Sequence, residues 1–304
     1  MSLLTIRPLE PEQIDLVTDW ARREGFAPGL GDVEIYRHTY RQGLWLGWLG
    51  HEPIGCIAGV RYNLNYGFIG LFIVMPSQRG HGYGKALWRH ALDHLADLTC
   101  VGLEAAAERI DDYAGWGFRP ASPTSRWQRI SPAVESTLCA GQPCFDGQPC
   151  FDGQPAGLQL LEGDAIPAQA VQHYDAQREL SPRPHFMADW LGHRAGTVKA
   201  LIDAQGRCHG FGRIRPCLLP QGEGWRIGPL LADTPALAEH LIQQLLIRHA
   251  GVVLIDTPGA NAAAEPLMRG LGFVRVGGTL RMYKGALPAV PLDDVYALAC
   301  LELG

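Results

Sequence analysis

The 304-residue sequence predicts an α/β protein built from two copies of one mixed unit, and internal spacing is the main reason. An Ile-Gly pair ending at Gly70 is followed by a Gly-Phe pair at Gly117, 47 positions later. A second Ile-Gly pair ends at Gly228, and a Gly-Phe pair follows at Gly272, 44 positions later. Each interval contains a stretch with helical periodicity and an apolar strand. The length suits two domains, and 47% apolar residues suffice for two cores.

Three segments follow from this repeat: an N-terminal domain over residues 1–132, a linker over 133–157 and a C-terminal domain over 158–304. The linker contains GQPCFD twice in tandem, followed by GQP, from Gly141 to Pro155. Its Gly and Pro content is typical of a connecting segment. We interpret its repeated cysteines as part of a duplicated loop, in preference to a thiol switch.

The first domain opens with a strand and a helix. Residues 3–9 alternate as a strand does, and residues 11–23 place their apolar side chains mostly on one helical face. A Gly/Pro-rich loop and a short second helix follow. Residues 43–49 and 53–62 then form a predicted hairpin around the Gly50-His51 turn.

The centre of this domain is predicted by the segment GFIGLFIV, residues 67–74, which is almost continuously apolar. Such a run suits a strand buried on both faces. Helical spacing follows over residues 84–95, and residues 99–104 return as an apolar strand. We therefore expect a strand, loop, helix, strand unit here.

Composition excludes several classes of function. With 26 Lys and Arg against 31 Asp and Glu, the net charge is −5, so we expect no nucleic-acid partner. The N-terminus lacks a signal-peptide pattern and no apolar run approaches the ~18 residues that span a bilayer, so we expect a cytoplasmic protein without membrane association. The eight cysteines form no C-x-x-C, and we expect neither disulfides nor a metal site.

The chemistry-bearing loop follows the buried strand and reads Gln78-Arg-Gly-His-Gly-Tyr-Gly-Lys85. Its three glycines allow the backbone to approach a ligand closely. The N–H groups of the loop and of the next helix would converge on an anion such as a pyrophosphate.

This loop resembles the acetyl-CoA signature of the GNAT N-acetyltransferase superfamily, Q/R-x-x-G-x-G/A, as Arg79-x-x-Gly82-x-Gly84. Tyr113 lies four residues before Gly117-Phe118, which resembles the Y-x-x-x-G-F stretch of many GNAT enzymes. More narrowly, the loop together with RIGPLLAD and the closing VYALACLELG is similar to tandem GNAT proteins with a degenerate C-terminal acetyltransferase-like domain.

The resemblance implies two tandem GNAT-like domains, each with a mixed, mostly antiparallel sheet, flanking helices and splayed central strands. It further implies that acetyl-CoA binds in the first domain. The backbone of Phe72, Ile73 and Val74 would pair with pantetheine. The phosphate loop would comprise Arg79, Gly80, His81, Gly82, Tyr83, Gly84 and Lys85.

The implied activity is transfer of an acetyl group from acetyl-CoA to a primary amine by direct attack in a ternary complex. We expect a small-molecule amine and a monomer or homodimer. Tyr113 is the expected proton donor to the leaving thiolate. No acid lies on the strand at residues 67–74, so Glu104 is the expected general base, with Asp32, Asp111 and Asp112 as competitors. An acyl-CoA-binding sensor or pseudoenzyme, or a transferase using another acyl donor, is the alternative.

The second copy is expected to bind no CoA. Residues 233–238, DTPALA, replace the arginine and glycines of the loop, and Met268 stands where Tyr113 does in the first copy. We expect this domain to form a wall of the acceptor pocket or a dimer surface. Asp256 corresponds to Glu104, and two roles are open for it: a helix cap before Pro258, which we favour, or a contact with a cationic substrate.

Overall fold

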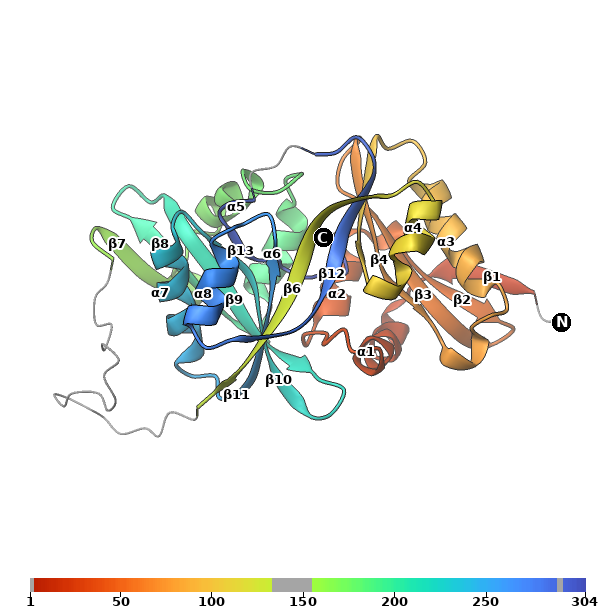
Figure 1. Cartoon of the computed structure of the whole chain (residues 1–304), viewed down its shortest axis with the longest axis horizontal. Coiled ribbons are helices and arrows are strands. Elements are labelled where there is room, and N and C mark those ends of the chain that lie inside the picture. Colours follow the sequence, from red (N-terminus) through yellow and green to blue (C-terminus); the bar gives the residue numbers. More distant parts are fainter. Residues whose placement is uncertain (1–2, 133–154, 289–291) are drawn as a thin grey trace.

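The computed structural model describes residues 3–132, 155–288 and 292–304. The GQPCFD repeat and the predicted linker up to residue 154 lie outside the described residues. The first half follows the predicted order of elements (Figure 1). Its strands are β1 (Leu4–Pro8), β2 (Leu44–Leu49), β3 (Glu52–Arg61), β4 (Tyr66–Val74), β5 (Cys100–Ala105) and β6 (Arg119–Ser131). Its helices are α1 (Ile14–Arg23), α2 (Asp32–Thr39), α3 (Tyr83–His94) and α4 (Ile110–Gly115).

The second half repeats this order element by element and adds one short strand at the end. Its helices are α5 (Ala168–Ala176), α6 (Pro184–Gly192), α7 (Pro235–Leu246) and α8 (Ala264–Gly270). Its strands are β7 (Leu158–Glu162), β8 (Thr197–Asp203), β9 (Cys208–Leu218), β10 (Glu223–Ala232), β11 (Gly251–Pro258), β12 (Val274–Gly285) and β13 (Val295–Ala297). The predicted repeat is therefore present in the fold.

The two halves share one continuous sheet because they exchange their last long strands. The strand order is β1-β2-β3-β4-β5-β12-β6-β11-β10-β9-β8-β7. Strand β12 of the second half pairs with β5 of the first, and β6 of the first half pairs with β11 of the second. Figure 1 shows β6 and β12 crossing the middle of the molecule side by side. This exchange was not predicted from the sequence.

Helices cover the sheet, and the apolar side chains between helices and strands form three main core clusters. Helix α3 packs Leu87, Trp88 and Ala91 against the first half's strands, and α7 does the same for the second half. The largest cluster joins both halves through α1, α2, α5, α6 and the C-terminal residues. No helix of the described residues has the length and apolar character required to cross a bilayer.

A buried ion pair links the halves within this shared core. Asp32 at the start of α2 accepts hydrogen bonds from Nε and Nη2 of Arg215 on β9, both at 2.8 Å. Both side chains are 0% exposed. Burial opposes ionisation of Asp32, but Arg215 outweighs it and lowers the carboxyl pKa.

Strand β13 and Leu298, near the end of the chain, lie between two strands of the second half. Strands β10 and β11 pair in parallel up to Ile227 and Ile255 and then diverge. Strand β13 fills the opening by pairing with Leu230 and Leu231 of β10. The N–H of Leu298 then donates to the carbonyl of Asp256 on β11 at 2.9 Å. The second half's splay is therefore occupied by its own chain.

Candidate active site

The corresponding opening in the first half has no such strand among the described residues. Strands β4 and β5 pair in parallel from Tyr66 to Ile69, and no pairing with β5 is present beyond Ile69. Leu71, two residues further on, has a φ of 46°, a left-handed conformation that is unusual for a leucine, and the β3–β4 register shifts near this point. The bulge turns β4 away from β5, so residues 70–74 present one backbone edge to the opening. The predicted splay of the central strands is confirmed.

The glycine loop closes one end of this opening. Gly80 and Gly82 have φ of 82° and 84°, and a Cβ at either position would meet nothing within 4 Å. Ala86 donates its N–H to the Gly82 carbonyl at 3.2 Å, which starts helix α3. The N–H groups before it have no intrahelical acceptor and point from the positive end of the helix dipole. The loop and helix terminus together form a cradle for an anion.

Arg79 holds this loop in place. Its Nε donates to the Val74 carbonyl at 2.9 Å, and its Nη2 pairs with Glu24 at the end of α1 at 2.5 Å. Gly84 lies against β4, because a Cβ there would stand 3.3 Å from Val74 and 3.4 Å from Phe72. The loop is thus fixed to the C-terminal end of β4.

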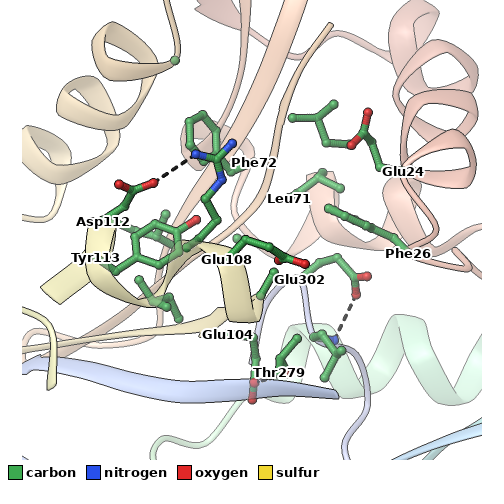
Figure 2. A pocket seen from close by; sticks show the side chains of 18 of the residues that line it. Glu24, Phe26, Leu71, Phe72, Glu104, Glu108, Asp112, Tyr113, Thr279 and Glu302 are labelled. Atoms are coloured by element: carbon green, nitrogen blue, oxygen red, sulfur yellow. Dashed lines mark hydrogen bonds and ion pairs between the residues drawn. The ribbon is translucent and has the colours of Figure 1, made fainter. Parts of the chain in front are cut away.

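A cavity of about 1450 Å³ extends from the loop into the space between β4 and β5 (Figure 2). Most residues predicted to bind the cofactor line it: Phe72, Ile73, Val74, Arg79, Gly80, Gly82, Gly84 and Lys85. His81 and Tyr83 are not among its lining residues; their rings stack at 5.9 Å, and His81 is exposed. The second half supplies part of the wall through β12 residues 276–279, Asp256, Leu301 and Glu302.

Tyr113 lies on α4 at the cavity and packs its ring on Trp88 at 4.9 Å between centroids. Burial raises the pKa of its hydroxyl above the ordinary value, while Arg109 lowers it and Asp112 raises it. The hydroxyl therefore remains protonated at neutral pH. Figure 2 shows the Tyr113 ring among the side chains that line the cavity.

Glu104 lines the cavity, but its carboxylate is already engaged. Arg281 of the exchanged strand β12 donates to Oε1 at 2.6 Å, Thr124 donates to Oε1 at 3.0 Å, and Thr279 donates to Oε2 at 2.5 Å. Only 2% of the Glu104 side chain is exposed. Three donors hold this carboxylate in a buried ion pair between β5, β6 and β12.

Asp256 also lines the cavity and is likewise neutralised. Arg126 pairs with both oxygens at 2.7 and 3.0 Å, and Arg226 reaches Oδ2 at 2.8 Å. Burial opposes ionisation, but the two guanidinium groups outweigh it and lower the pKa to about 2. Two arginines already engage both oxygens of this carboxylate, which leaves neither the helix cap nor the contact with a cationic substrate as its role.

The remaining predicted acids lie elsewhere. Asp32 is enclosed by its pair with Arg215 and is absent from the cavity wall. Asp111 and Asp112 are exposed on α4 at the cavity mouth, and Asp112 pairs with Arg109 at 3.0 Å.

Three acidic residues of the cavity escaped the sequence analysis, Glu24, Glu108 and Glu302, and of these only Glu302 is buried. Glu302 lies in the closing segment, is 5% exposed and lines the cavity. Its Oε2 accepts hydrogen bonds from the Tyr36 hydroxyl and the Leu301 N–H, both at 3.0 Å. Its position between the halves depends on tertiary structure, and no local pattern signals it.

The opening between β10 and β11 in the second half differs from the opening between β4 and β5 in the first half. The pair Ile227 and Ile255 occupies the place of Ile69 and Leu103 at the end of the parallel pairing. Beyond it, β13 pairs with β10, and helix α7 starts at Thr234, whose side chain caps the Leu237 N–H at 3.3 Å. The edge that is open on β4 is therefore covered on β10.

Comparison with known proteins agrees with this geometry. Residues 14–118 match the model of the acetyltransferase (GNAT) family, and residues 171–297 match that of an acetyltransferase (GNAT) domain. The chain is a protein of the GNAT acyltransferase superfamily. Because both halves match and the fold repeats, it is a tandem GNAT protein.

Several known proteins are similar over nearly the whole chain. A holothin acyltransferase from Pseudoalteromonas sp. (strain SANK 73390) is 28% identical over 303 residues, covering 99% of this chain and 94% of the relative. A putative acetyltransferase from Pyrococcus horikoshii superposes with a TM-score of 0.76 at 20% identity, covering 99% of this chain and 96% of its own. A tandem GNAT protein from the clavulanic acid biosynthesis pathway gives 0.62 at 17% identity, covering 94% and 100%. These structures support the fold.

Proposed function

We propose that the protein is an N-acetyltransferase that transfers an acetyl group from acetyl-CoA to the primary amine of a small molecule. The observation that carries this proposal is the open edge of β4 beside an anion cradle in the first half. The same edge is covered by β13 in the second half. One coenzyme site per chain follows from this difference.

The residues of the first half fit acetyl-CoA. The unpaired edge of residues 72–74 offers N–H and C=O groups to an extended amide-bearing arm, as a neighbouring strand would. Gly80 and Gly82 leave the space above the loop free, and the α3 N-terminus attracts pyrophosphate. Exposed Lys85 adds positive charge at the same end. Bound there, acetyl-CoA would supply the acetyl thioester.

Tyr113 is proposed to protonate the sulfur that leaves. A thiol has an ordinary pKa near 8.5, so a proton donor lowers the barrier to its departure. The raised pKa of Tyr113 keeps the hydroxyl protonated at neutral pH. Glu104, by contrast, already accepts three hydrogen bonds, and we propose that it fixes β12 against β5 and leaves proton abstraction to another group.

The acceptor is proposed to enter from the side formed by both halves. Phe26 and Leu71 provide apolar surface there, and acidic side chains including Glu108 and Asp111 surround the mouth. This combination suits a small organic cation. The 28%-identical relative is named for acyl transfer involving holothin, which supports an acceptor of the small-molecule class.

A calorimetric titration with acetyl-CoA tests the cofactor assignment. We expect one site per chain, which Gly82→Val in the glycine loop should abolish. The matched control is Ala236→Val in the first turn of α7, which should leave acetyl-CoA binding unchanged. Thiol release would then be followed with acetyl-CoA and a panel of phenethylamine, tryptamine, glucosamine and holothin. Binding without turnover on any amine would favour the acyl-CoA sensor. Turnover with a longer acyl-CoA but not with acetyl-CoA would favour a transferase that uses another acyl donor.

A further inference from the structure

Acyl transfer to an ammonium ion requires a group that takes up its proton. Few carboxylates in the cavity are available for this role. An alkyl ammonium has a pKa near 10.4, so most of it carries no lone pair at neutral pH. Glu104 and Asp256 are neutralised by arginines, and Glu24 pairs with Arg79. Glu108 and Asp111 also line the cavity, but both are exposed to solvent.

Glu302 also has an arginine nearby, but its hydrogen bonding differs from that of the other buried acids. Among the acidic side chains that line the cavity in the described part of the chain, it is buried and yet keeps one oxygen without a hydrogen-bond donor. Tyr36 and the Leu301 N–H engage Oε2, whereas Oε1 has only the Arg226 guanidinium, at 3.7 Å. Burial raises the pKa of Tyr36 well above its ordinary value, so this hydroxyl remains a donor and orients the carboxylate.

The fold places Glu302 at the point where β4 and β5 separate. A Cβ on Gly70 would collide with the Glu302 carbonyl, so the absence of a side chain at Gly70 admits the closing segment directly beneath the bulge. The segment is anchored on both sides of Glu302. Strand β13 pairs with β10 before it, and the Tyr62 hydroxyl donates to the Leu303 carbonyl at 2.9 Å after it. Figure 2 shows Glu302 and Tyr113 on different walls of the cavity.

We propose that Glu302 is the proton acceptor for the amine, delivered to the first half's cavity by the C-terminal segment of the second; this inference rests on the proposed acetyltransferase function. Oε1 takes one proton from the ammonium, which leaves the nitrogen lone pair to form the amide C–N bond while the thioester C–S bond breaks. Tyr113 gives its proton to the sulfur and regains one from the nitrogen. The proton on Glu302 passes to solvent, so each turnover releases one proton overall.

Glu302→Gln tests this role because it keeps the shape and both hydrogen bonds to Oε2 but cannot accept the proton. With the alkylamines of the panel, kcat should fall about 100-fold, in the range of general-base catalysis, with KM little changed. Hydroxylamine is already neutral at pH 7, and its rate should fall less than about threefold. Calorimetric binding of acetyl-CoA should match the wild type. The melting temperature should fall somewhat, because the buried Arg226 loses one of its two carboxylate partners and keeps the pair with Asp256.

Two further variants separate this role from a structural one. Glu302→Asp should restore part of the alkylamine rate, and Glu265→Gln, a remote exposed carboxylate on α8, should behave as wild type. An equal loss with hydroxylamine and alkylamines, or an undiminished alkylamine rate, would overturn the role of Glu302 while leaving the transferase intact. A wild-type protein that binds acetyl-CoA and acetylates no amine would instead overturn the proposed function, and this inference with it.

Discussion

Asp32→Asn should destabilise the protein strongly, because it breaks the buried ion pair between the halves. The wild-type carboxylate accepts two hydrogen bonds from Arg215 at 2.8 Å and one from the Gly29 N–H at 2.9 Å, with no solvent exposure. Removing one partner of a buried pair costs about 3–5 kcal/mol. Arg215 retains the Gly228 and Ala299 carbonyls at 3.0 and 3.2 Å, which places the expected loss near ~3 kcal/mol.

Thermal unfolding followed by circular dichroism measures this effect. At about 2 °C per kcal/mol for a chain of this size, the melting temperature should fall by roughly 6 °C or more. Glu265→Gln is the control: its exposed pair with Arg269 should contribute under about 0.5 kcal/mol. Asp32→Leu combined with Arg215→Met should recover most of the loss, because it leaves no unpaired buried charge. A shift for Asp32→Asn no larger than the control's would refute the reasoning.

Three further outcomes are expected. Tyr113→Phe should lower kcat about 100-fold without weakening acetyl-CoA binding, since the ring still packs on Trp88; a rate within threefold of wild type would exclude it as the acid. Gly82→Val should abolish calorimetric acetyl-CoA binding. It should lower the free energy of unfolding by only about 1–2 kcal/mol, because valine must adopt a φ of 84° but its side chain meets no neighbouring atom. In the folded protein the pKa of Asp256 is lowered from 3.8 to about 2. Its ionised carboxylate therefore adds about 2 kcal/mol to the free energy of unfolding above pH ~4, and this contribution is lost as the pH falls toward 2. Urea unfolding across this range should show the loss in wild type and a flatter profile in Asp256→Asn.

Local patterns in the sequence were sufficient to predict the strand and the glycine loop that form one side of the candidate site. The apolar run at residues 67–74 is β4, and the glycines at 80 and 82 have the left-handed backbone that their residue type permits. These features depend on neighbouring residues and on the helix that follows them. The fold class was predicted for the same reason.

The acceptor side could not be predicted, because it depends on contacts between residues far apart in the chain. Arg281 neutralises Glu104 across 177 positions, and nothing near Glu104 indicates that partner. The exchange of β6 and β12 leaves the periodicity of both strands unchanged, since each meets an equivalent strand, β11 or β5, in the other half. Glu302 reaches the cavity only because Gly70 leaves room for the closing segment.

The exchanged strands also bear on how such a chain arose from a shorter one. A single ancestral copy would end in the counterpart of β6, and two such chains could trade that strand to form a symmetric homodimer with the same sheet order. Gene duplication would then join the partners in one polypeptide without changing the pairing. Once joined, the two openings between the splayed strands would be free to diverge, and the opening of the second half is now filled by β13. Severing the polypeptide between residues 133 and 154 should therefore leave two fragments that copurify and retain the site.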